Sequence, residues 1–259
     1  MAAAHDPTAV IGPAEIGVLV YGVLCVFGAA VVRGYSGFGF SLLVITALSI
    51  VIPPRDFLPS IFMMEIAASL HLLPGVWREV HWRATGILLA GCLLATPIGV
   101  WLLDHVPAAP MTLAIALFVL GSAVLLARGF AFKAMPGRLA TAATGGAAGL
   151  CNGAFGIAGP PVILFFFSSP AGAQVGRASL IAFFIGTDTL GLAFQARQGL
   201  IGWDDPLRAV VYLAPLLVGI RLGARAFRGT DPARFRIWVL RILMGLAAVT
   251  GAQALAAML

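Results

Sequence analysis

Long apolar runs separated by short polar or charged turns make up nearly the whole chain. The turns carry Pro, Gly and charged residues, as at 53–56 (PPRD) and 204–206 (DDP), which end regular structure. Several runs reach the length of about 20 apolar residues that a helix needs to cross a bilayer. The pattern predicts ten helical elements, at 14–33, 38–52, 56–75, 84–103, 110–128, 138–152, 156–169, 177–198, 207–227 and 235–257. We therefore expect an all-α polytopic membrane protein.

Composition agrees with this prediction. Of the 259 residues, 61% are hydrophobic and only 10% are charged, whereas soluble domains carry charge on about a quarter of their residues. So few charges argue against a soluble enzyme, a disordered chain or a disulfide scaffold. The cysteines Cys25, Cys92 and Cys151 lie in apolar stretches without CxxC spacing, and the chain has no phosphate-binding P-loop. We expect no metal, no cofactor and no direct use of ATP.

Lysine and arginine are unevenly divided between the two sides of the predicted helices. Twelve fall on one side and three on the other: Arg78, Arg83, Arg128, Lys133, Arg138, Arg177, Arg221, Arg225, Arg228, Arg234, Arg236 and Arg241 against Arg55, Arg197 and Arg208. Because cytoplasmic loops carry the excess of basic residues, the first side is predicted to be cytoplasmic. Both termini then lie on the outer side of the membrane. The same bias accounts for the net charge of +6, and we expect no nucleic-acid partner.

The two halves of the chain share a glycine motif. Residues 34–40 (GYSGFGF) resemble residues 151–157 (CNGAFGI) at a shift of 117 residues. This spacing predicts two copies of one unit, at 1–130 and 131–259, with five elements in each. Because five is odd, the second copy enters the membrane from the opposite side. Such inverted repeats are the ground plan of many secondary transporters.

The segments beside the two motifs are too short to span a bilayer. Residues 41–52, 139–151 and 161–169 are expected to form half-helices that meet near the midplane, or re-entrant hairpins. Backbone groups freed by such a break cost several kcal/mol each unless they line a cavity and meet a ligand, and helix N-termini suit an anion. The alternative is that the glycines only permit tight helix packing. Two motifs at matching positions favour a binding site.

Ionisable residues inside apolar stretches supply the candidate chemistry, because they are costly there and usually functional. Arg33 is predicted to pair with an anion, although it could instead snorkel to an interface. Glu65 and Asp188 lie on equivalent elements and are candidate proton or Na⁺ coupling sites, or else structural partners of Arg33. His71 is a weaker coupling candidate. The predicted substrate-binding residues are Arg33, Gly34, Tyr35, Ser36, Gly37, Phe38, Gly39, Asn152, Gly153, Phe155, Gly156, Gly159 and Pro160.

Both motifs resemble those of a known family. Arg33 followed by GYSGFGF, and GGAAGLCNGAFGIAGPP at 145–161, are similar to the sulfite exporter TauE/SafE family of bacterial inner-membrane permeases. The resemblance implies export or uptake of a small sulfur-containing anion, such as sulfite, thiosulfate, sulfoacetate or another organosulfonate, across a bacterial inner membrane, with both termini then in the periplasm. From the repeats and the two carboxylates we expect alternating access coupled to H⁺ or Na⁺. The motifs differ where one has Tyr35-Ser36 and the other Cys151-Asn152, so the substrate cannot be inferred by symmetry.

Two other functions compete with a coupled permease. A passive anion channel would need no coupling carboxylate. The string Gly34-Tyr35-Ser36-Gly37 also matches the GxSG surroundings of the nucleophile in rhomboid-type intramembrane proteases, with a histidine as base. The second motif has no serine yet keeps its glycines, which argues against an enzyme.

Overall fold

The computed structural model describes residues 13–48, 57–105, 117, 120–121, 124–125, 127–128, 132–155, 157–197, 199 and 201–256. Every regular element in these ranges is a helix. The α-helices are α1 (Pro13–Ser36), α2 (Phe40–Leu48), α3 (Leu58–Leu72), α4 (Trp82–His105), α6 (Arg138–Phe155), α7 (Gly159–Phe167), α8 (Gly172–Arg197), α9 (Asp204–Val211), α10 (Leu213–Arg228) and α11 (Pro232–Ala256), and the 3-10 turns are η2 (Leu73–Gly75) and η3 (Trp77–Glu79). The expected element at 110–128 lies largely outside the described residues.

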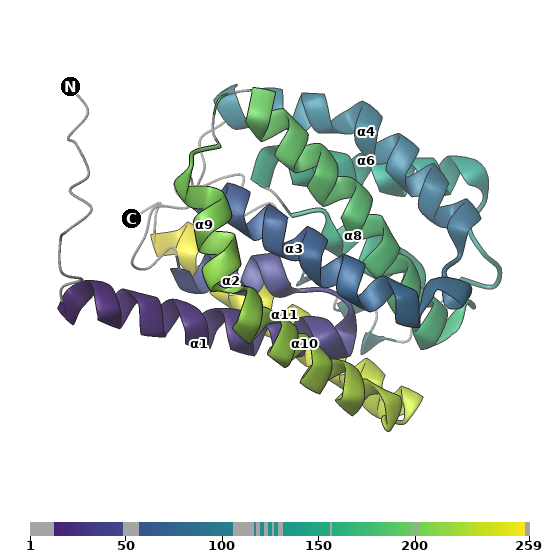
Figure 1. Cartoon of the computed structure of the whole chain (residues 1–259). Coiled ribbons are helices and arrows are strands. Elements are labelled where there is room, and N and C mark those ends of the chain that lie inside the picture. Colours follow the sequence, from purple (N-terminus) through teal and green to yellow (C-terminus); the bar gives the residue numbers. More distant parts are fainter. Residues whose placement is uncertain are drawn as a thin grey trace.

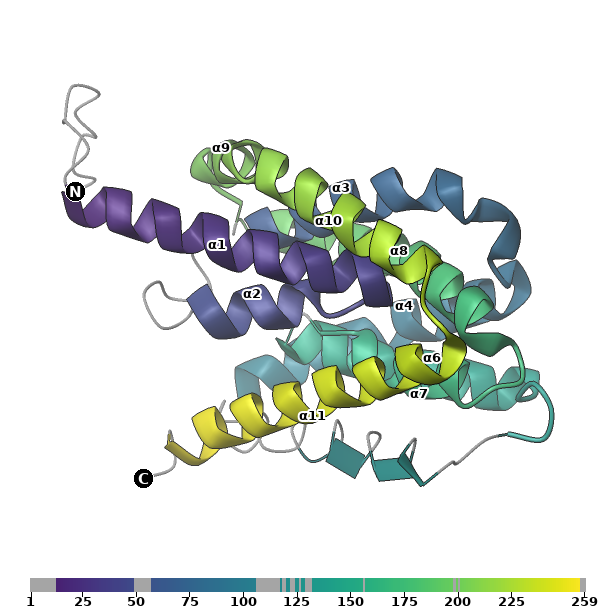
Figure 2. The ribbon, with the colours of Figure 1, turned by 90° about the horizontal axis from the view of Figure 1, so that it is seen from below.

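Three packed helix pairs organise the molecule (Figure 1). Helix α1 packs on α10, α4 packs on α6, and α3 packs on α8. The first pair approaches very closely, because a Cβ atom on Gly34 would collide with the carbonyl oxygen of Ile220. Helix α11 contacts α2 and α8 and runs along the outside of the bundle (Figure 2). Each of the first two pairs joins a helix of the N-terminal half to a helix of the C-terminal half.

Two short helices lie beside the glycine motifs. Helix α7 spans nine residues, about 14 Å at 1.5 Å per residue, so it is too short to cross a bilayer alone. Helix α2 is described over nine residues. The chain reverses between α1 and α2 at Gly37 and Gly39, whose φ angles of 82° and 92° are strained for residues with a side chain. Helix α6, at 18 residues, is longer than the predicted 138–152.

Two predicted boundaries are wrong. Helix α1 continues through Ser36, so Arg33 lies inside its last turn and not at a break. The single element expected at 207–227 is two helices, α9 and α10, that meet at Tyr212 with a bend of 45°. Pro215 explains the bend, because proline has no N–H for the carbonyl four residues earlier and its ring crowds that carbonyl.

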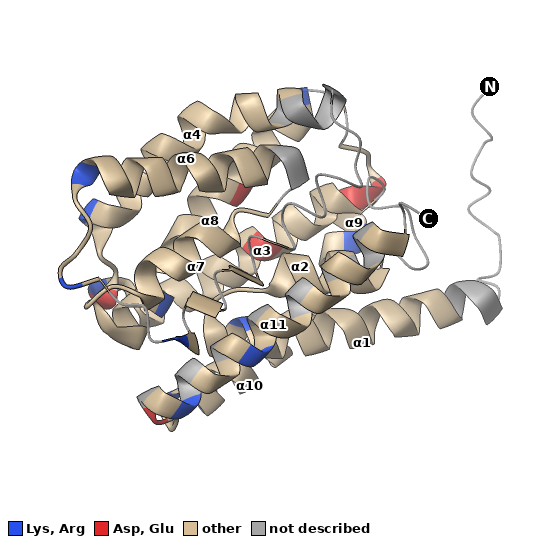
Figure 3. Cartoon of the chain, turned by 180° about the vertical axis from the view of Figure 1, so that it is seen from behind, with Lys and Arg blue, Asp and Glu red and all other residues tan. Residues whose placement is uncertain are grey.

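The described helices are suited to a membrane. Four of them are long and apolar enough to cross a bilayer, at Gly17–Ser36, Leu58–Gly75, Trp82–Gly99 and Gly172–Arg197, and the bent pair α9–α10 makes a fifth if it forms one span. Lys and Arg gather at the end of the molecule away from the two termini (Figure 3). The chain is therefore a multi-pass helical membrane protein, as its apolar pattern predicts.

Candidate functional site

Arg33 is the centre of a buried polar cluster. Its side chain is 0% exposed, so it does not snorkel to an interface. Its Nη1 donates to the carbonyl oxygen of Gly37 at 2.7 Å, and its Nη2 donates to Ser69 Oγ at 2.6 Å. The guanidinium also lies 4.5 Å from the ring centroid of Phe184, a cation–π distance. Helices α1, α3 and α8 thus fix Arg33 in one position.

Glu65 links Arg33 to the start of α2. Its Oε2 lies 3.0 Å from Arg33 Nη2, an ion pair that is not aligned as a hydrogen bond. Its Oε1 accepts from the backbone N–H of Ser41 at 3.1 Å and from the Ser41 hydroxyl at 2.5 Å. The N–H groups in the first turn of a helix have no partner within the helix and carry its positive dipole end. The carboxylate of Glu65 therefore occupies the N-terminus of α2.

Asp188 and Asn152 extend the cluster toward the second motif. Asp188 lies one turn after Phe184 on α8, is 3% exposed, and its Oδ2 has no hydrogen-bond partner among the described residues. Asn152 Nδ2 donates to the carbonyl oxygen of Thr187 at 3.4 Å, while its buried Oδ1 also lacks a described partner. The cluster thus holds one guanidinium against two carboxyl groups.

Arg177 is a second buried cation, although the count of basic residues places it among the charges of the cytoplasmic side. It was expected to face the cytoplasmic interface, yet it is 4% exposed. Its Nε donates to the carbonyl oxygen of Tyr35 at 3.0 Å, and its Nη2 donates to that of Gly34. These carbonyls belong to the C-terminal turn of α1, where cations are stabilising. Without Arg177 the count of basic residues is eleven against three, so the predicted orientation is unchanged.

Ser36 is engaged with its own backbone. Its hydroxyl donates to the carbonyl oxygens of Val32 and Phe38 at 2.8 and 2.9 Å. His71 is exposed in the last turn of α3, and His81 Nδ1 accepts from the N–H of Ala84. Among the described residues, the geometry does not form the serine–histidine pair that a protease would need.

Comparison with known proteins identifies the family of the chain. The family model described as "Sulfite exporter TauE/SafE" matches residues 22–250. The chain belongs to the sulfite exporter TauE/SafE family. It is 27% identical over 245 residues to the "Probable sulfite/organosulfonate exporter TauE" of Cupriavidus necator, an alignment that covers 91% of this chain and 94% of that protein. No solved structure matches the chain.

The remaining predicted residues of this TauE/SafE protein are buried or half-buried near the two glycine motifs, or lie outside the described part. Phe38 is buried in the core, and Gly159 and Pro160 are buried at the start of α7. Gly153 is half-buried in the last turn of α6. The side chain of Phe155 and all of Gly156 lie outside the described residues. The sequence did not single out Ser41 and Ser69, although Ser69 follows Glu65 by four residues on one face of α3.

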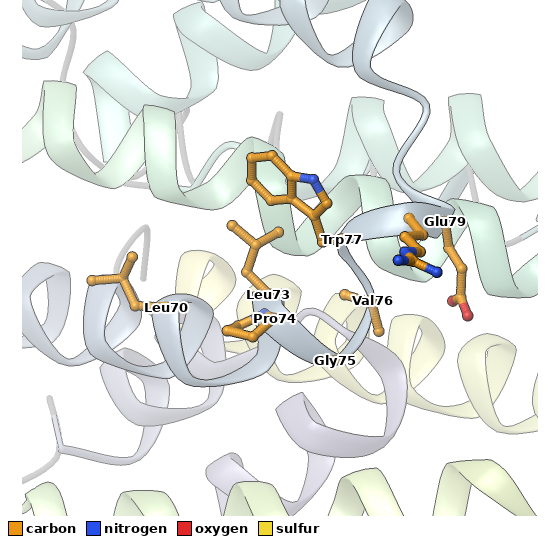
Figure 4. A pocket seen from close by; sticks show the side chains of 8 residues that line it. Leu70, Leu73, Pro74, Gly75, Val76, Trp77 and Glu79 are labelled. Atoms are coloured by element: carbon orange, nitrogen blue, oxygen red, sulfur yellow. The ribbon is translucent and has the colours of Figure 1, made fainter.

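Two pockets lined by described residues of the TauE/SafE chain do not contain these charges. A pocket of about 610 Å³ lies where α3 turns into η2 and η3, with Trp77 and Glu79 on its wall (Figure 4). A smaller one, of about 220 Å³, lies between α1, α3 and the bend at Tyr212 and includes Met64, the neighbour of Glu65. We place the candidate site at the buried charges, because a polar cluster inside a membrane needs a functional explanation and a pocket beside a surface turn does not.

Proposed function

We propose that this chain is a permease that moves a small sulfur-containing anion across the inner membrane by alternating access. The candidate substrates are sulfite, thiosulfate and organosulfonates such as sulfoacetate. Membership of the TauE/SafE family supports this proposal, and so does the printed name of the Cupriavidus necator relative. The observation that carries it is a fully buried arginine, Arg33, beside the N-terminus of the short helix α2.

The proposed substrate site lies between the two glycine motifs, at 33–39 and 152–160. A guanidinium offers paired N–H donors to oxoanions, and a helix N-terminus adds backbone N–H groups and a positive dipole end. Arg177 holds the carbonyl groups of Gly34 and Tyr35, which turns acceptor groups away from an arriving anion. Arg33 would bind the anion, and Arg177 would keep the motif in position.

Coupling to H⁺ or Na⁺ is proposed to involve the two buried carboxyl groups, Glu65 and Asp188. One guanidinium cannot neutralise both, and an unbalanced charge in a low-polarity interior is costly. A bound proton or cation would restore the balance. His71, which is exposed at the end of α3, would act at most as a relay from the surface.

Alternating access is proposed to arise from two inverted halves, 1–130 and 131–259. The exchanged helix pairs support this arrangement: α1 packs on α10, and α6, the counterpart of α1, packs on α4, the counterpart of α10. Helices α3 and α8, which are counterparts, pack on each other. Inverted repeats let one bundle rock against another around a central site.

Uptake of labelled sulfite, thiosulfate and sulfoacetate into proteoliposomes, with and without imposed pH and Na⁺ gradients, tests the proposed function. We expect gradient-driven accumulation of one sulfur anion, lost in Arg33→Gln and retained in the matched variant Arg83→Gln near the α4 start. Equilibration of the anion that is independent of both gradients would instead favour a passive channel. Absence of flux for every anion would overturn the sulfur assignment.

A further inference from the structure

The carboxylate of Glu65 is itself a bound anion. It lies 3.0 Å from the Arg33 guanidinium and accepts hydrogen bonds from the backbone N–H and the hydroxyl of Ser41. These are a cation, a helix N-terminus and a hydroxyl, which together are the donors that proteins offer to small oxoanions. At 1% exposure, Glu65 closes this position to solvent.

Arg33 is held in place by groups other than Glu65. The Arg33 side chain is anchored independently by the carbonyl oxygen of Gly37 and by Ser69 Oγ, and its planar group rests on Phe184. Its Nε is buried with no hydrogen-bond partner among the described residues. The ion pair to Glu65 is also not aligned as a hydrogen bond. The site therefore has unused donor capacity, and the Arg33 guanidinium is held by groups other than the carboxylate that fills the site.

We propose that Glu65 is a tethered stand-in for the substrate: its carboxylate and the transported oxoanion compete for the Arg33 guanidinium and the N-terminus of α2. This inference rests on the proposed function and deepens it, because the carboxylate that takes up the coupling proton is then also the competitor of the anion. In the conformation described here the site is occupied by the protein's own carboxyl group.

A proton makes the exchange electrically neutral. When a proton from solution forms an O–H bond on the Glu65 carboxylate, the side chain loses its charge and its attraction to Arg33. An incoming monoanion then supplies the negative charge that Glu65 has lost, so the net charge of the site is unchanged. One anion therefore enters with one proton. Asp188, on α8 beside Phe184, is the other acidic group of this cluster, and Ser41 and Ser69 are its neutral polar neighbours. Coupling by competition needs no separate cation site.

Calorimetric titration of the purified full-length protein with 2-hydroxyethanesulfonate tests the inference. This probe keeps one negative charge from mildly acidic to neutral pH, so any pH dependence belongs to the protein. We expect the affinity of the wild type to rise as pH falls, with uptake of about one proton per bound anion from a weakly buffered solution.

The variant Glu65→Gln should bind the sulfonate about tenfold more tightly at neutral pH, with no proton uptake and no pH dependence. The matched control is Glu79→Gln, whose carboxylate accepts from Gln174 near η3 and lies outside the site, and it should behave as the wild type does. Should Glu65→Gln fail to fold, the wild-type titration still decides, because pH-independent binding by the wild type overturns the inference.

Three further results would overturn it: weaker binding by Glu65→Gln, proton uptake that persists in that variant, or absence of binding by both proteins. Failure of the proposed function can be distinguished from failure of this inference. If wild-type proteoliposomes accumulate a sulfur anion while Glu65→Gln binds no more tightly than the wild type, the permease stands and the competition does not. If no sulfur anion moves but Glu65→Gln gains pH-independent affinity, the competition stands and the proposed transport fails.

Discussion

The two buried arginines differ in what their guanidinium groups contact. Arg177 donates to two backbone carbonyls at the end of α1 and lies 4.4 Å from the ring centroid of Phe227, so its charge is met by dipoles and an aromatic face. Arg33 faces a full negative charge on Glu65. The first arrangement is structural, whereas the second leaves a charge that can change partner.

Removal of Arg177 should cost stability. Arg177→Gln leaves the carbonyls of Gly34 and Tyr35 without their donor, and a buried polar group that loses its partner costs about 1–3 kcal/mol. We expect a lower melting temperature in detergent, measured by tryptophan fluorescence. Arg78→Gln, at an exposed position of η3, is the control and should melt with the wild type. Equal melting temperatures for the wild type and both variants would contradict a stabilising role of Arg177 at the end of α1.

Arg33 and Glu65 should be energetically coupled. Loss of one partner from a buried ion pair costs about 3–5 kcal/mol, because it strands the other charge. Arg33→Gln should therefore destabilise the protein, and the double variant Arg33→Gln, Glu65→Gln should recover much of that loss. Melting temperatures of the two single variants and the double variant measure the coupling, and additive effects would refute it.

Helix contacts explain why glycine stands at particular places in α1. At Gly34 a Cβ would meet the backbone of Ile220 on α10, whereas at Gly28 it would meet nothing within 4 Å. In the sequence Gly34 follows Arg33 in the glycine motif, whereas Gly28 lies among apolar residues, but neither setting shows which glycine another helix touches. Only the packing of α1 against α10 shows this.

Alanine at these two positions should have opposite effects. Gly34→Ala pushes α1 away from α10 and should cost about 1–3 kcal/mol, the usual range for overpacking. Gly28→Ala adds only a methyl group to an open helix face and should be neutral or stabilising by up to about 1 kcal/mol. Expression in membranes and melting in detergent provide the readout. An equal loss of stability in both variants would show that the α1–α10 contact is looser than described.

Much of the element order could be predicted from the sequence, because long apolar runs and Pro or Gly breaks carry that information locally. The bend at Tyr212 was missed because the apolar run continues through it. Arg177 was placed at the interface because counting charges between helices does not reveal which side chains fold inward. The roles of Ser41 and Ser69 depend on contacts between α1, α2 and α3, which no spacing in the chain encodes. Arg33, Glu65 and Asp188 were selected because charge in an apolar run is conspicuous.

The orientation of the whole molecule in the membrane is open to a direct test. Lys and Arg concentrate at the end away from the termini (Figure 3), and this end is predicted to be cytoplasmic. Alkaline phosphatase fused to the C-terminus should therefore be active, whereas a green fluorescent protein there should remain dark. A fusion after Ala134, in the connection between the halves, should give the reverse pattern. Fluorescence of the C-terminal fusion would show that the protein has the opposite orientation in the membrane.

The exchanged pairs α1–α10 and α4–α6 have a consequence for how the chain holds together. Close glycine contacts let a helix of one half cover the backbone of a helix of the other half, and a separated half would expose that backbone. We therefore expect that neither half is stable by itself. The peptide that joins them contributes mainly effective concentration, keeping two complementary fragments close enough to find each other. Two separately expressed fragments, split at that joint, should therefore reassemble in one membrane into a functional transporter.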